Sequence, residues 1–159
     1  GFMIGKRSEQ GGIIKDGAKM VNAVANYVVP KITIITGNSY GAGNYAMCGK
    51  AYDPRFIFAW PTAQIAVMGG TQAAKVLTQI KVSSLEKKGK EITDEEKAAI
   101  LKKIKDRYDT QTDVRYAAAR LWVDGIIAPE DTRNKISGAI RYANYNPDIP
   151  EFKTGVLQV

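Results

Sequence analysis

A turn of small residues between a strand and a helix is the part of the chain best suited to chemistry. Residues 32–36 are all β-branched, which predicts a short buried strand. Residues 38–43 follow as a turn rich in glycine and alanine, and residues 44–50 are compatible with a helix that begins at once. Such a junction places unpaired backbone N–H groups at one point, where they can bind a phosphate, an enolate oxygen or a carbonyl oxygen.

The glycine spacing excludes two well-known phosphate-binding motifs. Gly37, Gly41 and Gly43 do not match G-x-G-x-x-G, and Lys50 comes too late in the chain for a P-loop. A second interpretation stays open at this point, namely a tight turn that needs small residues only for packing.

Histidine is absent from the sequence. Its absence excludes Ser-His-Asp and Cys-His triads, histidine metal sites and histidine acid–base catalysis. The single cysteine, Cys48, lies in an apolar segment, so we expect a packed thiol in a protein of a reducing compartment. Chemistry in this chain must therefore rest on backbone donors, on Tyr, Lys or carboxylates, or on groups from another chain or a cofactor.

Length and composition predict one globular domain. The chain has 159 residues, 45% of them hydrophobic, which is enough for a core. No apolar run approaches the roughly 20 residues that a membrane span needs, so no membrane partner is expected. The chain begins at Gly1 without an initiator Met or a signal peptide, and we expect it to be part of a longer polypeptide.

The net charge of +7 is not spread evenly, and residues 81–107 hold nine Lys and Arg against six Asp and Glu. The two signs are mixed and no aromatic residues lie between them, which favours a solvated charged helix over a nucleic-acid surface. The overall positive charge also predicts attraction for anionic ligands such as phosphorylated cofactors.

The remaining elements follow from hydrophobic period and end signals. We expect a loop at residues 6–12, a helix at 16–29, strands at 56–60 and 64–68, and a short extended piece at 126–127. Further helices are predicted at 72–81, at 94–108 behind a Thr93–Glu96 capping box, at 112–122, and from Pro129 to about Tyr145. The side chains expected to face inward are Ala73, Ala74, Leu77 and Ile80 in the first, and Ala117, Ala118, Leu121 and Trp122 in the third. The apolar stripe of the second is Ile100, Leu101, Ile104 and Tyr108. This order predicts an α/β layered core with a helical C-terminal extension.

Several ordered motifs together resemble a known family. They are GFMIG at residues 1–5, KDGAKM at 15–20, SYGAGNY at 39–45, PRF at 54–56, WP at 60–61, VMGG at 67–70, DGII at 124–127 and PEDTR at 129–133. They are similar to the carboxyltransferase β subunit of biotin-dependent acyl-CoA carboxylases, above all the methylcrotonyl-CoA carboxylase branch. The resemblance implies a crotonase-like ββα superhelix, with residues 1–159 forming the latter part of the C-terminal domain and lacking the N-domain and the first strands of the C-domain.

The resemblance also implies roles for individual residues. The backbone N–H groups of Ala42 and Gly43 would form an oxyanion hole for the ureido oxygen of biotin, and Tyr45 would line the acyl pocket. A protein base and a metal ion would not be needed, because the biotin ureido group can take the proton from the acyl-CoA. The substrate-binding residues implied in this way are Tyr40, Gly41, Tyr45, Met68, Gly69 and Gly70. For Tyr45 a buried helix aromatic, and for residues 68–70 a simple strand end, are the competing interpretations.

The partners implied by the family are an acyl-CoA substrate, the N-domain, a biotin carboxylase and biotin carrier subunit with covalently held biotin, and further copies of the chain in a hexamer. The expected location is the cytoplasm, or the mitochondrial matrix in a eukaryote. Two alternatives stay open: the transferase subunit of a biotin-dependent decarboxylase such as glutaconyl-CoA decarboxylase, and a noncatalytic oligomer-interface module. Neither nucleic acid nor a membrane is expected as a partner.

Overall fold

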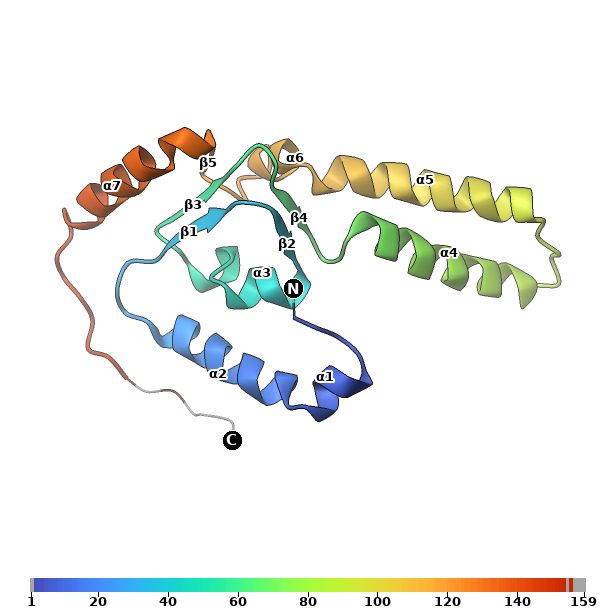
Figure 1. Cartoon of the computed structure of the whole chain (residues 1–159), viewed down its shortest axis with the longest axis horizontal. Helices are drawn as coiled ribbons and strands as arrows, with labels where there is room; N and C mark the ends of the chain where they lie inside the picture. The colour runs from blue at the N-terminus through green and yellow to red at the C-terminus, as the bar shows by residue number, and fades with distance from the viewer. Residues whose placement is uncertain (1, 154, 156–159) are drawn as a thin grey trace.

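Two small parallel sheets hold the middle of the chain (Figure 1). A computed structural model of the chain describes residues 2–153 and 155. The larger sheet has the order β1-β3-β5, formed by β1 (Ile32–Ile35), β3 (Phe56–Ala59) and β5 (Gly125–Ile126). The smaller sheet pairs β2 (Asn38–Tyr40) with β4 (Gln64–Ala66). The strands predicted at residues 32–36, 56–60, 64–68 and 126–127 are thereby confirmed, each somewhat shorter or shifted by a residue.

The core lies where the larger sheet meets α6 (Val114–Ala118). Ile57 and Ala59 point inward from β3, the central strand, and are almost fully buried. Val114 of α6 packs into the same cluster. Removing such side chains from water is the main source of stability for a small sheet of this kind.

Helices surround the sheets on several sides (Figure 1). On one side lie α1 (Lys6–Gln10), α2 (Ile13–Asn26) and α3 (Gly41–Ala46), whereas α7 (Thr132–Ala143) lies beyond β5. The helices α4 (Gly70–Glu86) and α5 (Asp94–Thr112) form a long antiparallel hairpin that leads away from the sheets. Short 3₁₀ turns at Lys50–Tyr52 and Pro129–Asp131 complete the described elements. The predicted α/β core with a helical C-terminal part is confirmed.

The charged helix begins as its sequence predicts. The Thr93 hydroxyl accepts a hydrogen bond from the Glu96 N–H, and the Glu96 carboxylate accepts one from the Thr93 N–H, which completes the capping box. Ile100 and Ile104 are half-buried, while Lys102 and Lys103 stay exposed. Leu101 lies at the margin of this stripe and is exposed. The predicted phase of the helix is therefore right for two of its three central apolar residues.

Several helix boundaries differ from the predictions. Residues 6–12 are not a loop but contain α1. This helix begins with the backbone hydrogen bond from the Glu9 N–H to the Gly5 carbonyl, and Gly12, in a left-handed conformation, separates it from α2. The polar composition of this segment predicts a loop, but most of its residues are equally compatible with a surface helix. Further on, α2 covers 13–26 instead of 16–29, α4 covers 70–86 instead of 72–81, α5 reaches 112 instead of 108, and α6 covers 114–118 instead of 112–122. The helix predicted from Pro129 to about Tyr145 is a 3₁₀ turn at 129–131 followed by α7 at 132–143.

Four side chains predicted to be buried are exposed. Leu77 and Ile80 are 39% and 60% exposed, because α4 packs through Ala73, Ala74 and Thr78 instead. Small residues on that face let α4 approach its neighbours closely. Leu121 is 78% exposed and Trp122 is 42% exposed, because the helix ends at residue 118 and Leu121 adopts a left-handed conformation with φ of 59°.

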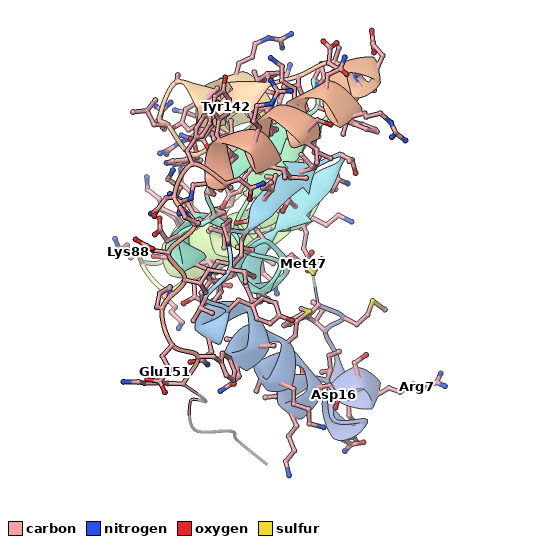
Figure 2. The ribbon with its side chains drawn as sticks, turned by 90° about the vertical axis from the view of Figure 1, so that its left-hand side faces the viewer. Arg7, Asp16, Met47, Lys88, Tyr142 and Glu151 are labelled. Carbon is pink, nitrogen blue, oxygen red and sulfur yellow. The ribbon has the colours of Figure 1, made fainter. Side chains whose placement is uncertain are left out.

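Apolar side chains also lie exposed at two opposite ends of the molecule. Figure 2 shows Tyr142 on α7 at one end, and Arg7 and Asp16 on α1 and α2 at the other. Exposed apolar residues at these two ends are Met3, Ile4, Ile14, Tyr142 and Tyr145. Apolar surface of this extent is typical of a site that another protein segment covers. Among residues 2–153 and 155, no helix combines the length and the apolar character that crossing a membrane requires.

Candidate functional site

The chain passes directly from β2 into α3, without the intervening turn that the sequence predicts. Residues 38–43 were expected as a turn and 44–50 as a helix, but residues 38–40 pair with β4 and the helix already begins at Gly41. Residues 38–40 form a strand because they pair with β4, whose residues are 26 positions further along the chain. Ala42 and Gly43 therefore lie in the first turn of α3, where backbone N–H groups have no partner within the helix.

Glycine is required at the first position of α3. Gly41 has a φ of 51°, a left-handed conformation that side chains disfavour. A Cβ atom at this position would lie 2.7 Å from the carbonyl oxygen of Val67. The absence of a side chain thus lets the start of α3 lie directly against the chain that follows β4.

Two further contacts fix the start of α3. The side-chain amide of Asn44 donates a hydrogen bond of 2.9 Å to the hydroxyl of Ser39 on β2. A Cβ atom on Gly49 would come within 2.7 Å of both oxygens of Asn44, so this residue is held closely from the other side. The backbone N–H groups of Ala42 and Gly43 lie between Ser39 and Asn44 in the chain, so the hydrogen bond between these two side chains helps to hold them in position.

A second helix begins at the same end of the smaller sheet. The strands β2 and β4 are parallel with Tyr40 opposite Ala66, so the chains that leave them lead to the N-termini of α3 and α4 (Figure 1). Gly69 lies against the ring of Tyr40, since a Cβ atom there would be 3.6 Å from the ring. The carboxylate of Asp109 also lies at the start of α4, 2.9 Å from where a Cβ atom of Gly70 would be, and it offsets the positive end of that helix.

The Tyr40 phenol is neutral and held in place. Its hydroxyl donates a hydrogen bond of 2.6 Å to the Oε1 atom of Gln64. Burial, and secondarily the negative charge of Asp109, raise the pKa of Tyr40 above its ordinary value. Tyr40 therefore acts as a hydrogen-bonding and packing group at neutral pH.

A mostly apolar cavity of about 470 Å³ opens beside the start of α3. Its floor is made of Ile35, Ile57 and Ile65 from the two sheets, and Gly41 and Tyr45 form one wall. The opposite wall comes from α5, α6 and the chain after them, through Tyr108, Gln111, Tyr116 and Trp122. The cavity can hold an apolar or planar group next to the helix N-terminus.

The residues predicted to form the site are found at one end of the β2–β4 sheet, but not all face the cavity. Gly41 and Tyr45 line it. Ala42 is exposed and Gly43 is half-buried, both on the same helix. Tyr40, Met68, Gly69 and Gly70 lie at the strand ends and are outside the lining of this cavity.

Tyr45 is 48% exposed, so the alternative of a buried helix aromatic is wrong. Its ring lies against that of Tyr52, with centroids 4.6 Å apart and an interplanar angle of 55°. Burial and a hydrogen bond with Tyr45 raise the pKa of Tyr52 to about 12. The pair holds the Tyr45 ring at the cavity wall.

The aromatic wall opposite Tyr45 was missed as part of the site. Tyr108 and Trp122 were predicted only as packing residues, because their sequence positions carry a helical apolar pattern and no chemical motif. Arg120 lies over the Tyr116 ring at 3.3 Å and fixes that part of the wall. Within residues 2–153 and 155 there is no group of three or more His, Cys, Asp or Glu side chains arranged to hold a metal ion.

Comparisons with known proteins were made on sequence and on structure. A family model described as carboxyl transferase domain matches residues 1–157. The chain is 52% identical over 159 residues to the mitochondrial methylcrotonoyl-CoA carboxylase beta chain of Arabidopsis thaliana, covering 100% of this chain and 27% of that protein. It is 49% identical over 147 residues to the biotin-dependent 3-methylcrotonyl-coenzyme A carboxylase beta1 subunit of Mycobacterium tuberculosis, covering 92% of this chain and 28% of that subunit.

Solved structures give a matching result. The beta subunit of P. aeruginosa geranyl-CoA carboxylase superposes with a TM-score of 0.81 at 41% identity, covering 100% of this chain and 29% of that one. The transcarboxylase 12S structure, described as a hexamer assembly, superposes with a TM-score of 0.80 at 36% identity, also over the whole chain and 29% of its own. The chain thus spans little more than a quarter of the length of these relatives.

Proposed function

The chain belongs to the carboxyl transferase family, and from this premise we propose that it forms the carboxybiotin-facing part of the transferase site in a biotin-dependent acyl-CoA carboxylase of the methylcrotonyl-CoA type. Its fold is the crotonase-like α/β fold of carboxyltransferase β subunits, as the sequence motifs imply. The observation that supports the proposal is the direct passage from β2 into α3, whose first residue, Gly41, lines an apolar cavity.

We assign the oxyanion hole to the backbone N–H groups of Ala42 and Gly43. Biotin, carried covalently by a partner, would supply the carboxyl group and a ureido oxygen that becomes negatively charged. A neutral, preorganised backbone donor pair fits such an oxygen, and the exposed Ala42 leaves room for its approach. Removing one donor of this kind typically raises a reaction barrier by about 3 kcal/mol.

Gly41 and the Asn44–Ser39 hydrogen bond hold these N–H donors in position. The left-handed Gly41 sets the direction in which α3 leaves the sheet, and the Asn44–Ser39 hydrogen bond holds its first turn. Preorganised donors need no rearrangement as charge develops, which is why their support matters for the rate.

The cavity beside Tyr45 is proposed to accept the acyl end of the substrate. Its isoleucine floor and aromatic walls suit a branched, unsaturated acyl group. Tyr40, Met68, Gly69 and Gly70 are proposed to border the same cleft in the complete enzyme, from the second strand end.

The decarboxylase alternative is the weaker one. The alpha subunit of methylmalonyl-CoA decarboxylase of Propionigenium modestum is 39% identical over 141 residues, against 52% over 159 residues for the Arabidopsis carboxylase beta chain. The noncatalytic module is also disfavoured, because a module that only joined protomers would not need a left-handed Gly41 at the edge of a cavity.

The remaining partners are proposed from the same relatives. We infer that residues 1–159 are the latter part of a C-terminal domain, completed by an N-domain, by a biotin carboxylase with its biotin carrier and by further copies in a hexamer. The Arabidopsis and Dictyostelium relatives are named as mitochondrial, which supports the matrix as the location if the source is eukaryotic.

The test is carboxylation by the complete natural polypeptide together with its biotin-carrying partner. Incorporation of labelled bicarbonate should be measured with 3-methylcrotonyl-, geranyl- and propionyl-CoA. We expect the highest kcat/KM with 3-methylcrotonyl-CoA. If no acyl-CoA is carboxylated while the biotin is shown to be charged, the proposal is wrong.

A further inference from the structure

The chain reverses direction just after α6 and thereby brings a second aromatic ring to the wall of the cavity. The N–H of Trp122 donates a hydrogen bond to the Ala117 carbonyl, and the N–H of Leu121 donates one to the Ala118 carbonyl, both at 3.0 Å. These two bonds form a Schellman motif, in which one residue takes a left-handed conformation. Leu121 is that residue, with φ of 59°, and Trp122 follows it back against α6.

Leucine is an unusual residue for this position. Glycine normally takes the left-handed place in such a motif, because a side chain there is strained. The Leu121 side chain is 78% exposed, so its own packing within this chain does not account for the strained backbone. Strained backbone is found where a structure holds a neighbouring group in place for function. The neighbouring group here is Trp122, which lines the cavity.

The Trp122 ring contacts the ring of Tyr116 on α6. Their centroids are 5.9 Å apart and their planes are inclined by 69°, which is the edge-to-face geometry that aromatic pairs prefer. Both rings line the cavity. Tyr and Trp side chains have only two torsions each, so a pair of this kind forms a rigid corner that does not give way to a longer ligand.

Arg120 holds this aromatic corner from outside the cavity. Its guanidinium carbon lies 3.3 Å from the centroid of the Tyr116 ring, and its Nη1 atom donates a hydrogen bond of 3.2 Å to the Tyr116 carbonyl. Arg120 is exposed and is not among the residues that line the cavity. Its contacts therefore act on the wall and not on a ligand.

The aromatic corner lies across the cavity from α3. Gly41 and Tyr45 form the wall next to the assigned backbone donors, which is where the reacting end of the acyl group is proposed to lie. An acyl chain that extends from there across the cavity ends at Tyr116 and Trp122. A solved relative with the same fold is named for a geranyl group, which is longer than a methylcrotonyl group, so the fold itself does not limit acyl length. Side chains at the end of the cavity must set that limit.

We propose that Tyr116 and Trp122 are specificity-determining residues that limit the length of the acyl group, and that Arg120 is the positioning residue that holds them. This inference rests on the proposed function and deepens it by naming the acyl class. Short, branched acyl groups are accepted, and longer isoprenoid chains are excluded. Truncating the aromatic corner opens the cavity at the end where the additional carbons of a longer chain would lie.

The proposal is tested in the complete carboxylase with the variant Trp122→Ala. The kcat/KM is measured for 3-methylcrotonyl-CoA and for geranyl-CoA. The Kd of both esters and of free coenzyme A is measured by calorimetry, without carboxyl transfer. We expect the ratio of kcat/KM for geranyl-CoA over 3-methylcrotonyl-CoA to rise roughly tenfold or more, because one methylene in an apolar pocket changes discrimination by about 10–200-fold. Geranyl-CoA should also bind more tightly, whereas free coenzyme A, which has no acyl group, should bind as before.

Arg120→Gln tests the positioning role. The same ratio should rise by about threefold, because a cation–π contact at an exposed site is weak. Arg115→Gln is the matched control, because Arg115 is an exposed arginine of the same helix that pairs with Asp113 and does not line the cavity. Tyr116→Leu should change the ratio as Trp122→Ala does, and Tyr116→Phe, which restores a ring beneath Arg120, should bring the ratio back.

An unchanged ratio in Trp122→Ala would overturn the proposal, as would an equal loss of affinity for both esters and for free coenzyme A. An unaltered enzyme that already prefers geranyl-CoA would overturn it too. If Trp122→Ala does not fold, the smaller change Trp122→Leu decides by the same readouts. Failure of the proposed function is distinguishable, since the unaltered enzyme would then carboxylate neither ester.

Discussion

The side-chain amide of Asn44 donates a 2.9 Å hydrogen bond to the Ser39 hydroxyl, and this contact spans the junction between β2 and α3, whose first helical turn holds Ala42 and Gly43. It joins the end of β2 to the first turn of α3, which are otherwise connected only by the left-handed Gly41. The relationship links a local polar contact to the direction of the proposed oxyanion donors. The expected effects of changing it can be measured separately on stability and on rate.

Replacing Ser39 by alanine should remove this hydrogen bond and loosen the start of α3. The half-buried amide of Asn44 loses its acceptor, which typically costs about 1 kcal/mol of unfolding free energy. We expect a lower kcat for carboxylation as well, because the donors are less well held. Urea unfolding and steady-state kinetics check the two effects, with Ser83→Ala on the exposed face of α4 as the control. A variant with unchanged kcat would show that the Asn44–Ser39 hydrogen bond contributes to stability but not to the rate of carboxyl transfer.

Gly41→Ala should be more damaging. The new side chain meets a left-handed backbone with φ of 51° and a carbonyl oxygen 2.7 Å away, that of Val67. The left-handed backbone conformation alone costs an alanine about 1–2 kcal/mol. Gly89→Ala is the matched control, because Gly89 has a φ of 76° but nothing within 4 Å of its Cβ position. The difference in unfolding free energy between the two variants measures the clash with Val67, and equal losses would contradict it.

Local pattern was sufficient to predict the elements that have strong signals of their own. The β-branched run at residues 32–36 and the Thr93–Glu96 capping box are found as expected, and Pro129 begins a 3₁₀ turn that leads into α7. Where the predictions were wrong, a distant partner decides the structure. Residues 38–40 become a strand only because β4 pairs with them, and α4 packs through small residues instead of Leu77.

The candidate site could be predicted only in part, because half of its wall comes from residues far away in the chain. The motif around residues 39–45 can be recognised from the sequence, and Gly41 and Tyr45 do line one cavity. The opposite wall, with Tyr108 and Trp122, comes from helices more than 60 residues away in the chain. No local pattern indicates which apolar helix residues will face a ligand instead of the core.

The Tyr45–Tyr52 pair predicts a loss of stability at high pH. Burial and the hydrogen bond with Tyr45 raise the pKa of Tyr52 from 10.0 to about 12, so folding favours the neutral phenol. This stabilising contribution is fully present below pH 10 and is lost as the pH rises through 12. Urea unfolding between pH 9 and pH 12 should show a decline that is smaller in Tyr52→Phe. The control is Tyr145→Phe on the exposed end of the chain after α7, which should keep the full decline.

The apolar surface at α1 and α2 is expected to be an interface in the complete enzyme. Met3, Ile4 and Ile14 are each at least 70% exposed here. Ile14→Lys should leave the fold of this chain intact, because the side chain is already in solvent, but should weaken assembly of the complete subunit. Sedimentation velocity of the complete enzyme is the measurement, and Lys15→Ala on the neighbouring exposed position is the control. Unchanged assembly of the Ile14→Lys enzyme would place the interface elsewhere.

The most direct prediction concerns the N–H group of Gly43. A Gly43→Pro change removes this donor, and proline is tolerated in the first turn of a helix, where the N–H has no partner within the helix. Carboxyl transfer should fall by roughly two orders of magnitude or more, the usual effect of losing one oxyanion donor. The KM for the acyl-CoA should change little, because the donor is assigned to the biotin side of the reaction.

Two measurements separate this effect from damage to the turn. Gly43→Ala keeps the N–H group and should retain a far larger share of the rate than the proline variant does. Circular dichroism and thermal unfolding of both variants then report whether α3 and its surroundings persist, since proline also restricts Ala42 before it. A folded Gly43→Pro enzyme that transfers the carboxyl group at nearly the normal rate would show that the backbone donor at this position takes no part in the reaction.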